Sequence, residues 1–348
     1  MTTKKIAVLR GDYIGPEIMT AGLAVLAAAC TGKFAYQIQD LPFGGQAIDA
    51  VGDPLPAETI HSCQNADAVL LSAIGGPKWD QAKKRPEAGL LQIRNELQLF
   101  ANIRPTRVDP ILAQNSPVKE AVIQGTNFVI VRELTSGIYF GQPRKQTATA
   151  ALDTSTYTKQ EIERILRLGF KMSEHRQKHV TIIDKANVLA TSKLWRQVTQ
   201  QVQADFPTVK VDFSYVDAAS MKLISQPTFF DVIITANLFG DILSDEASVL
   251  TGSLGTIPSM SAGNNGPNLY EPIHGSAPDI AGKGIADPLA MIQSIEMMLR
   301  ESFHENQIAD QIAVAVRQTI KAGIVTPDLG GHATTKEVTA KIIENLKG

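Results

Sequence analysis

The 348-residue sequence has 33 basic and 35 acidic residues, a formal net charge of -2 and a 44% hydrophobic content. This balance gives no general attraction to nucleic acid or to an anionic membrane, so either partner would need a local basic surface. The length and the apolar content predict a globular chain with two domains or lobes. The two cysteines, Cys30 and Cys63, are too few for a disulfide framework and lack zinc-site spacing, so we expect free thiols in a reducing cytoplasm.

Short apolar runs followed by helical patterns recur along the chain. The N-terminal residues lead directly into an expected strand over 6–9, with no signal-peptide core before it. The uncharged, alanine-rich stretch 18–32 is too short to span a bilayer and favours a packed helix. The later runs that predict strands are 68–71, 129–131, 180–183 and 232–234. This alternation predicts an α/β chain with much parallel sheet.

The middle of the chain has the pattern of a separate lobe. Residues 147–158 favour extended or looped backbone, and the apolar spacing over 153–176 predicts a helix. Proline and glycine near Arg104-Pro105 and near Thr251-Gly252 indicate crossings between lobes. We therefore expect one lobe from 1–99 plus 252–348 and a second lobe from 100–251.

Two aspartates one helical turn apart follow the apolar run 230–235. Residues four apart lie on the same face of a helix, so Asp241 and Asp245 can direct two carboxylates to one point. Like charges that close repel unless a cation, a base or solvent compensates them, and a hard divalent cation is the attractive explanation. Asp217, which follows residues 211–216, either caps the helix that begins there or supplies a third metal ligand.

Three arginines occupy positions suited to binding a di-acid. Arg94 lies on a helical stretch, Arg104 precedes a proline, and Arg132 ends the apolar run 128–131. Guanidinium groups bind carboxylates through paired hydrogen bonds, so three of them around one cleft would suit such a substrate. The alternative is a set of surface salt bridges, which is less favoured for Arg132 because ligand sites of α/β proteins lie at strand ends.

Tyr139 and Lys185 are candidates for proton transfer. Lys185 is expected at the carboxyl end of a buried strand, where burial or nearby cations can lower the pKa of a lysine. The alternatives are an ordinary solvated lysine and a tyrosine that packs beside Phe140.

Two glycine-rich segments are candidate ligand loops. Residues 11–17 lie between the first strand and helix but lack the G-x-G-x-x-G spacing, so they also fit an ordinary helix start. Residues 274–284 are rich in small residues that let a ligand approach the backbone, although composition alone indicates a turn. Asp279 in such a loop can bind a ribose diol and would repel a 2′-phosphate, which favours NAD over NADP.

These motifs together resemble the isocitrate/isopropylmalate dehydrogenase family over nearly the whole chain. The segments that carry the resemblance are 44–49, 75–80, 99–105, 131–141, 184–189, 237–247 and 271–279. The resemblance implies a two-lobed α/β fold with a continuous mixed sheet, different from the Rossmann fold. It also implies that the first lobe binds the cofactor and that the second lobe holds the metal, the substrate and a dimer interface.

The resemblance implies the activity of a cytoplasmic oxidoreductase. The enzyme would act in leucine biosynthesis, which is part of branched-chain amino acid biosynthesis. It would decarboxylate (2R,3S)-3-isopropylmalate oxidatively with NAD, giving 4-methyl-2-oxopentanoate, CO₂ and NADH, and would require magnesium or manganese. Similar enzymes are homodimers in which Lys185, Asn187, Val188 and Asp217 reach the partner's active site. The alternative is another NAD-dependent β-decarboxylating 2-hydroxyacid dehydrogenase, acting on malate, tartrate or homoisocitrate.

The resemblance also implies roles for individual residues. Lys185 would deprotonate the substrate hydroxyl, and Tyr139 would protonate the enol carbon. The implied metal ligands are Asp217, Asp241 and Asp245. The implied substrate-binding residues are Arg94, Arg104, Arg132, Asp217, Glu87, Leu90, Leu91 and Val188. The implied cofactor-binding residues are Gly76, Pro77, Lys78, Glu87, His274, Gly275, Ser276, Ala277, Pro278, Asp279 and Asp287.

Substrate choice and cofactor affinity each have a physical argument. Leu90 and Leu91 precede Arg94 by four and three residues, so a helix places them on the same face, where they suit an isopropyl group better than a third carboxylate. Two positions depart from the pattern of the family: Tyr13 stands where glycine is usual and Asp287 where asparagine is usual. An asparagine amide can donate to adenine whereas a carboxylate cannot unless it is protonated, so we expect a weakened affinity for NAD.

Two functions from other classes fit less well. A metal-dependent phosphotransferase would need a P-loop lysine motif, which the sequence lacks. A catalytically silent subunit would have lost Tyr139, Lys185 or one of the aspartates, and all of them are present.

Overall fold

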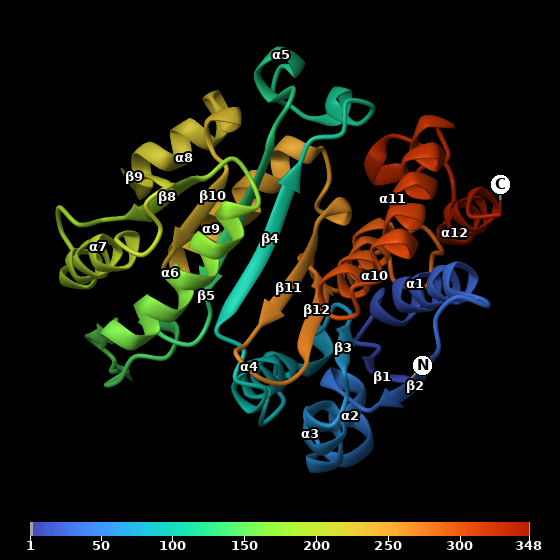
Figure 1. Cartoon of the computed structure of the whole chain (residues 1–348). Helices are drawn as coiled ribbons and strands as arrows, with labels where there is room; N and C mark the ends of the chain where they lie inside the picture. Colours follow the sequence, from blue (N-terminus) through green and yellow to red (C-terminus); the bar gives the residue numbers. More distant parts are fainter. Residues whose placement is uncertain (1–2, 348) are drawn as a thin grey trace. The chain divides into compact units, whose positions relative to one another are not determined.

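In the computed structural model, which describes residues 3–347, the chain divides into two compact units (Figure 1). The first unit combines Met1–Leu99 with Ser253–Gly348, and the second unit is Phe100–Gly252. Each unit contains strands and helices around its own hydrophobic core. The prediction of an α/β chain is confirmed.

The first unit has a mixed set of strands that is mainly parallel. The strands are β1 (Lys4–Leu9), β2 (Tyr36–Leu41), β3 (Ala68–Leu71), β11 (Pro258–Ala262) and β12 (Asn268–Pro272), in the order β2-β1-β3-β12-β11. β1 runs parallel to β2 and β3, β12 runs parallel to β3, and β11 is antiparallel to β12. All four residues of β3 are buried, as is typical of a parallel strand that is covered on both faces.

The helices of the first unit are α1 (Gly15–Cys30), α2 (Gly44–Val51), α3 (Ala57–Gln64), α4 (Pro86–Glu96), α10 (Leu289–Glu301), α11 (Asn306–Lys321) and α12 (Thr335–Asn345). α1 has Pro16 in its first turn, where the missing N–H costs no hydrogen bond. A Cβ on Gly22 would lie 2.7 Å from Ile295 Cδ1, so glycine lets α1 approach α10 closely. The packed helix predicted over 18–32 is therefore confirmed, with bounds shifted by a few residues.

The second unit has five main strands, β4 (Ala101–Arg107), β5 (Asn127–Glu133), β8 (His179–Asp184), β9 (Lys210–Tyr215) and β10 (Val232–Thr235), in the order β4-β5-β10-β8-β9. β4 is antiparallel to β5, and the other neighbouring pairs are parallel. A separate ribbon pairs β6 (Lys145–Gln146) with β7 (Ala151–Leu152). Arg104 and Pro105 lie inside β4, opposite Ile130 and Val129, so this proline does not end the strand.

The helices of the second unit are α5 (Glu120–Ile123), α6 (Lys159–Glu174), α7 (Ala190–Gln203), α8 (Val216–Ser225) and α9 (Asn237–Ser248). α6 begins at a capping box, in which Thr158 accepts from the Glu161 backbone while the Glu161 side chain accepts from the Thr158 backbone. The helix predicted over 153–176 is thus confirmed but starts later, because the capping residue is Thr158.

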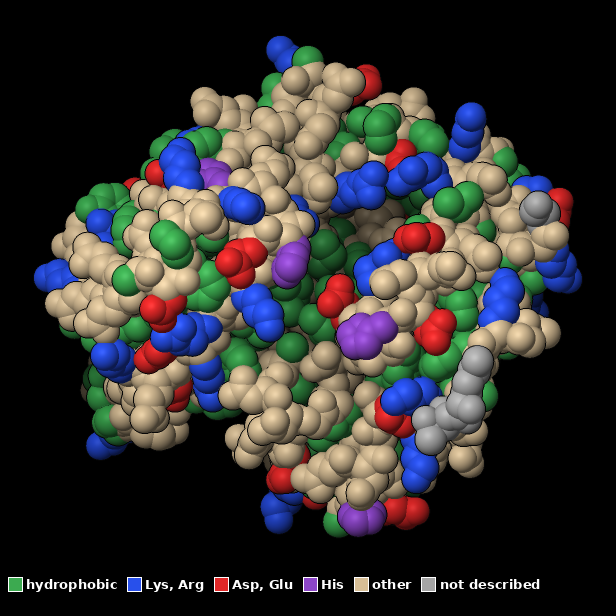
Figure 2. Space-filling view, viewed as in Figure 1, with side chains coloured by type: hydrophobic (Ala, Val, Ile, Leu, Met, Phe, Trp, Pro, Cys, Tyr) green, Lys and Arg blue, Asp and Glu red, His purple; other side chains and the backbone are tan. Residues whose placement is uncertain are grey.

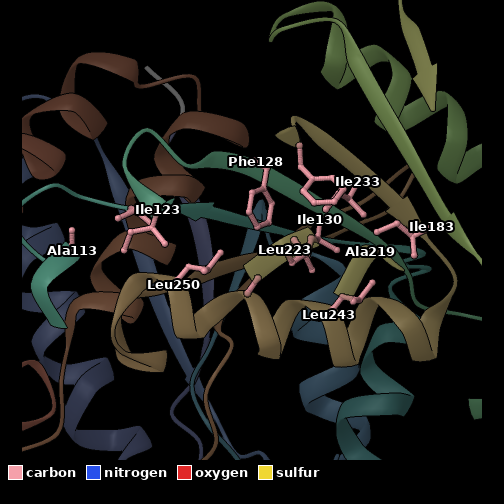
Figure 3. Close-up of a cluster of buried hydrophobic side chains, with 13 residues drawn as sticks. Ala113, Ile123, Phe128, Ile130, Ile183, Ala219, Leu223, Ile233, Leu243 and Leu250 are labelled. Atoms are coloured by element: carbon pink, nitrogen blue, oxygen red, sulfur yellow. The ribbon is translucent and has the colours of Figure 1, made fainter. Parts of the chain in front are cut away.

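The core of the second unit includes residues of β5, β10, α8 and α9 (Figure 3). Leu243 on α9 and Leu250 just after it point toward the strands, where Phe128 and Ile130 are fully buried. Each buried leucine contributes about 1.5–3 kcal/mol relative to an exposed one. This packing fixes the rotation of α9 about its axis and so determines which way its polar residues face.

On the face shown in Figure 2, basic and acidic side chains are interspersed, and neither sign of charge dominates that face. Within residues 3–347, no helix is long and apolar enough to cross a membrane. Cys30 and Cys63 are both buried free thiols, as predicted. Burial raises the pKa of Cys30 to about 11 and that of Cys63 to about 12, so both thiols are poor nucleophiles at neutral pH.

Candidate active site

Asp241 and Asp245 lie on α9, which follows the fully buried strand β10. Their separation of four residues puts both carboxylates on one helix face, as the sequence predicts. The preceding strands β5, β8 and β10 run parallel, so their carboxyl ends lie at one edge of the second unit. Ligand sites of α/β proteins form at such an edge.

Arg132, near the end of β5, is bound to the first turn of α9. Its Nη1 donates to Asp241 Oδ1 at 2.5 Å, and its Nε and Nη2 donate to Asn237 Oδ1 at 3.0 and 2.8 Å. A Cβ on Gly240 would lie 2.6 Å from Arg132 Cγ, so the arginine stem packs where only glycine leaves room. The guanidinium is therefore held beside Asp241 by both shape and hydrogen bonding.

Arg104, in the middle of β4, is bound to the next turn of α9. Its Nη1 donates to Ser244 Oγ at 2.7 Å and to Asp245 Oδ1 at 3.2 Å, while its Nε donates to Asn102 Oδ1 at 2.6 Å. Partial burial and the neighbouring charge of Asp241 raise the pKa of Asp245, and the Arg104 and Arg132 guanidinium groups oppose that shift. Two buried arginines thus compensate the two carboxylates of α9.

Tyr139 completes this cluster from a short 3₁₀ turn, Gly137–Tyr139. Its hydroxyl donates to Asp241 Oδ2 at 2.5 Å, and the Arg132 guanidinium lies 5.6 Å from the centre of its ring. Burial, followed by the hydrogen bond to the Asp241 carboxylate, raises the pKa of Tyr139. The phenol consequently keeps its proton at neutral pH.

Lys185 and Asp217 form a second pair in the same unit. Lys185 follows the last residue of β8, Asp217 lies in the first turn of α8, and the Lys185 ammonium donates to Asp217 Oδ1. That hydrogen bond lowers the pKa of Asp217. The N-cap of α8 is Tyr215, so the alternative that Asp217 caps this helix is wrong.

A single chain does not gather the three predicted metal ligands. Over the described residues 3–347, no group of three or more histidine, cysteine or acidic side chains is arranged to hold a metal ion. Asp241 and Asp245 come together, whereas Asp217 is bound to Lys185. Val188 is 65% exposed in the turn after β8.

Helix α4 of the first unit carries the predicted substrate-binding face. Glu87, Leu90, Leu91 and Arg94 are spaced so that they share one side of this helix. Leu90 packs partly against the core, and Leu91 is 39% exposed. Arg94 Nη2 donates to Glu271 Oε1 at 2.7 Å, and both side chains are largely buried. This arginine therefore has an acidic partner of its own within the unit.

The two predicted cofactor loops of the first unit are joined directly. Ser276 Oγ, in the loop that contains His274–Asp279, donates to the carbonyl oxygen of Gly75 at 2.7 Å. Pro77–Trp79 forms a 3₁₀ turn, in which Lys78 Nζ is paired with Asp49 at 2.6 Å. A Cβ on Gly75 would lie 2.5 Å from Glu87 Oε1, so Glu87 covers the start of this loop.

Asp287 is a buried ionisable group, and His274 is partly buried. Burial lowers the pKa of His274, which keeps its imidazole neutral, and its Nε2 atom is buried without a hydrogen-bond partner among the described residues. Asp287 is 7% exposed; its Oδ1 accepts from Leu289 N at 2.9 Å, whereas its Oδ2 is buried and lies near the Asp328 carboxylate. Burial, followed by the charge of Asp328, raises the pKa of Asp287 well above its usual range. A protonated carboxyl group can donate, as an asparagine amide can.

Asp287→Asn is expected to increase stability at neutral pH and to flatten its pH dependence. Because the folded pKa is raised, the contribution of protonated Asp287 is fully present below the unfolded pKa of about 3.9 and is lost as pH rises through the folded value. Asparagine does not titrate and its amide can donate to the Asp328 carboxylate, so replacing the buried carboxylate is worth about 1–3 kcal/mol. Urea unfolding of both proteins at acidic and at alkaline pH checks this, and two parallel pH profiles would contradict it.

The sequence of the whole chain matches a known family. The profile described as "Isocitrate/isopropylmalate dehydrogenase" matches residues 5–345. The chain belongs to this family. Its relatives include the 3-isopropylmalate dehydrogenase of Listeria innocua, 54% identical over 345 residues, covering 99% of both chains. The 3-isopropylmalate dehydrogenase of Streptococcus thermophilus is 57% identical over 345 residues, covering 99% of this chain and 100% of the relative.

Solved structures of the family have the same fold. The isocitrate dehydrogenase of Methylococcus capsulatus superposes with a TM-score of 0.89 at 34% identity, covering 99% of this chain and 100% of that one. A β-decarboxylating dehydrogenase of Thermococcus kodakarensis in its apo form gives a TM-score of 0.82 at 35% identity, covering 99% and 96%. The predicted fold class, an α/β fold of this family with a large mixed sheet rather than a Rossmann fold, is confirmed.

Several residues of the candidate site have no role in the sequence-based prediction. Asn237 and Asn102 hold the two guanidinium groups through their amide oxygens, and Glu271 binds Arg94. Gly240 makes room for Arg132. Asn237 and Gly240 stand in the same segment as Asp241, in the first turn of a helix that follows a buried strand. A polar and a small residue at such positions are the sequence features that could have indicated a role in the site.

Proposed function

We propose that the chain is a cytoplasmic oxidoreductase that converts (2R,3S)-3-isopropylmalate and NAD to 4-methyl-2-oxopentanoate, CO₂ and NADH in leucine biosynthesis. The observation that carries this proposal is the full-length match, at 54–57% identity, to 3-isopropylmalate dehydrogenases. The cluster of Arg104, Arg132, Tyr139, Asp241 and Asp245 supplies groups suited to a reaction on an anionic hydroxy acid.

Asp241 and Asp245 fit a divalent cation. Their oxygens are the hard ligands that Mg²⁺ and Mn²⁺ prefer, and the effect of Asp241 on the pKa of Asp245 is the repulsion that a cation would relieve. Asp217 of a second chain would supply the third carboxylate. When bound, such a cation supplies Lewis-acid stabilisation of negative charge on the substrate oxygens.

Arg104 and Arg132 in the second unit, and Arg94 in the first, bind the substrate carboxylates in this proposal. Each already holds an acidic side chain of the chain itself, namely Asp245, Asp241 and Glu271. A substrate carboxylate therefore replaces one oxygen ligand with another, and no guanidinium needs to be left unpaired. The buried positions of Arg104 and Arg132 fix the orientation of their guanidinium groups before substrate arrives.

Lys185 and Tyr139 move the protons. Lys185 takes the proton of the substrate hydroxyl on its Nζ atom as the neutral amine, after its ammonium has released a proton to solvent, and Asp217, its hydrogen-bond partner, fixes the position of that atom. Tyr139 holds its phenolic proton, because its pKa is raised, and delivers it to carbon after CO₂ has left. One group thus acts as the base and another as the acid.

The dinucleotide binds to the first unit in this proposal, through Gly76, Pro77, Lys78 and Glu87 and through His274–Asp279 with Asp287. NAD supplies the hydride acceptor. The hydrogen bond from Ser276 to Gly75 supports the assignment of both loops to one ligand, since it holds them side by side. Burial keeps the His274 ring neutral, so it offers one donor and one acceptor rather than a charge.

Leu90, Leu91 and Val188 are proposed to form the pocket for the isopropyl group. Leu91 and Val188 are 39% and 65% exposed, which leaves apolar surface for a substrate side chain to cover. A third carboxylate in place of the isopropyl group would lose water and meet no polar partner on these residues. This disfavours isocitrate as the substrate.

A homodimer is proposed because the second unit exposes apolar side chains on adjacent helices. Met221 on α8 is 68% exposed, and Ile242 on α9 is 56% exposed. α8 and α9 pack on each other, and an exposed apolar side chain on each helix is proposed to contribute to a subunit contact. A second copy placed there is proposed to bring its Lys185 and Asp217 to the Asp241–Asp245 pair.

The test is an assay of the purified chain with 3-isopropylmalate, NAD and Mn²⁺, followed by NADH absorbance. We expect NADH formation with 3-isopropylmalate and a much lower kcat/KM with malate, tartrate, homoisocitrate and isocitrate. A higher kcat/KM with another acid would replace the proposed substrate and keep the reaction class. If no acid of this panel yields NADH, the proposed function fails.

A further inference from the structure

Tyr13 adopts a backbone conformation that a tyrosine rarely takes. It lies in the turn between β1 and α1 with φ at +51°, in the left-handed region that favours glycine because a Cβ crowds the neighbouring carbonyl. A bulky residue that keeps such a conformation must gain from the position of its side chain, or glycine would be more stable there. The contacts of the Tyr13 ring therefore bear on its role.

The ring of Tyr13 covers the turn Pro77–Trp79 and the glycine before it. A Cβ on Gly76, whose φ is +146°, would lie 2.2 Å from Tyr13 Cε2, so the ring rests against bare backbone. The ring edge meets Trp79 with centroids 5.7 Å apart and planes at 72°, and Lys78 N donates a long hydrogen bond of 3.4 Å to the Tyr13 hydroxyl. Packing, more than hydrogen bonding, holds the ring in place.

The two residues that flank Tyr13 are hydrogen-bonded to both proposed cofactor loops. The buried carboxylate of Asp12 accepts from Gly75 N at 2.8 Å and from Gly45 N at 3.0 Å. Ile14 N donates to Ser276 O at 3.2 Å. The turn that carries Tyr13 is thus bonded to the loop at Gly75 and to the loop at Ser276.

We propose that Tyr13 is a positioning residue of the cofactor site, whose ring holds residues 76–79 in the conformation that receives the dinucleotide. The inference rests on the proposed function, since that function assigns NAD to these loops. Glycine at position 13 would relieve the backbone strain but would also remove the ring that packs on residues 76–79. The dinucleotide would then have to order this turn when it binds, which would weaken its affinity.

The experiment compares Tyr13→Gly with the wild type by titration with NADH, followed by Trp fluorescence, and by steady-state kinetics. We expect NADH to bind about 2- to 10-fold more weakly and the KM for NAD to rise by a similar factor, which corresponds to ordering about one side chain. The KM for 3-isopropylmalate should stay unchanged and the thermal midpoint should not fall, because the substitution relieves backbone strain. Tyr13→Phe, which keeps the ring, should restore the wild-type affinity.

His304→Gly is the matched control, because His304 is exposed and has a φ of +58° in the same unit. The substitution relieves the same kind of backbone strain at a position outside both proposed cofactor loops. It should therefore leave the affinity for NADH unchanged. Equal NADH affinity in Tyr13→Gly and wild type would overturn the inference and leave the proposed function standing. If Tyr13→Gly lowers the thermal midpoint and changes both KM values together, Tyr13 is only structural, which also overturns it. A wild type that binds no NADH would overturn this inference and the proposed function together.

Discussion

Lys185→Met is expected to lower kcat about 10²- to 10⁴-fold, the range that a positioned general base contributes. Methionine keeps the length and the apolar stem of lysine but removes the amine that donates to Asp217. The fall should appear in kcat for 3-isopropylmalate while the KM for NAD changes little, because Lys185 lies in the second unit. Steady-state NADH formation measures both constants.

Lys193→Met is the control for this substitution. Lys193 is an exposed residue of α7 in the same unit, so its replacement removes the same charge without touching Asp217. We expect wild-type kcat from the control. A Lys185→Met enzyme that retained most of its kcat would remove Lys185 from the proposed chemistry.

Asp241→Asn is expected to lower kcat/KM by about 10²- to 10³-fold, comparable to the loss of a charge-stabilising group at a reacting centre. Asp241 is the acceptor for both Arg132 and Tyr139, so the substitution also removes the carboxylate that holds these two groups. Calorimetric titration with Mn²⁺ gives a readout that does not depend on turnover, and we expect affinity at least about 10-fold weaker. Circular dichroism checks folding, since Arg132 loses a buried charge partner.

Glu246→Gln is the matched control for Asp241→Asn. Glu246 lies on the same helix, and its carboxylate accepts from Ser220 Oγ at 2.8 and 2.9 Å. Glu246→Gln removes one negative charge from α9, as Asp241→Asn does, but at a position outside the cluster that contains Arg104 and Arg132. We expect wild-type affinity for Mn²⁺ from the control, and equal losses in both variants would point to a general effect of charge on the helix.

Mixing the two inactive variants tests whether the sites are shared between chains. A heterodimer of Lys185→Met and Asp241→Asn would contain one site with both defects and one intact site, if Lys185 acts on the partner's aspartates. When equal amounts of the two variants reassociate at random, half of the dimers are mixed, and each mixed dimer has one intact site of its two. About a quarter of the wild-type activity should therefore return. No recovery, in a mixture shown to contain heterodimers, would place Lys185 in the site of its own chain.

Much of the fold follows from local patterns in the sequence. The buried run before Asn237 and the four-residue spacing of Asp241 and Asp245 sufficed to predict a strand followed by a helix with two carboxylates on one face. α1 and α6 were likewise visible from their apolar spacing. Such patterns depend only on the periodicity of neighbouring residues, which the chain carries wherever it folds.

The partners of the charged groups could not be read from the sequence. Arg132 and Asn237 are 105 residues apart, Arg104 and Asp245 are 141 apart, and Arg94 and Glu271 are 177 apart, so only strand order and helix packing bring them together. The capping role considered for Asp217 was wrong because the helix begins two residues earlier than that role requires.

The sequence by itself determined the family, the α/β class and the identity of the groups that can carry charge or a proton. Only the tertiary structure decided the direction in which the pKa of Asp287 shifts and the contacts of Tyr13. The pKa of Asp287 depends on burial and on Asp328, 41 residues later in the chain. The strain at Tyr13 is a property of one backbone angle, and the ring contacts that accompany it are made with a loop more than 60 residues away. Both effects arise from desolvation and packing between distant segments, which no local pattern encodes.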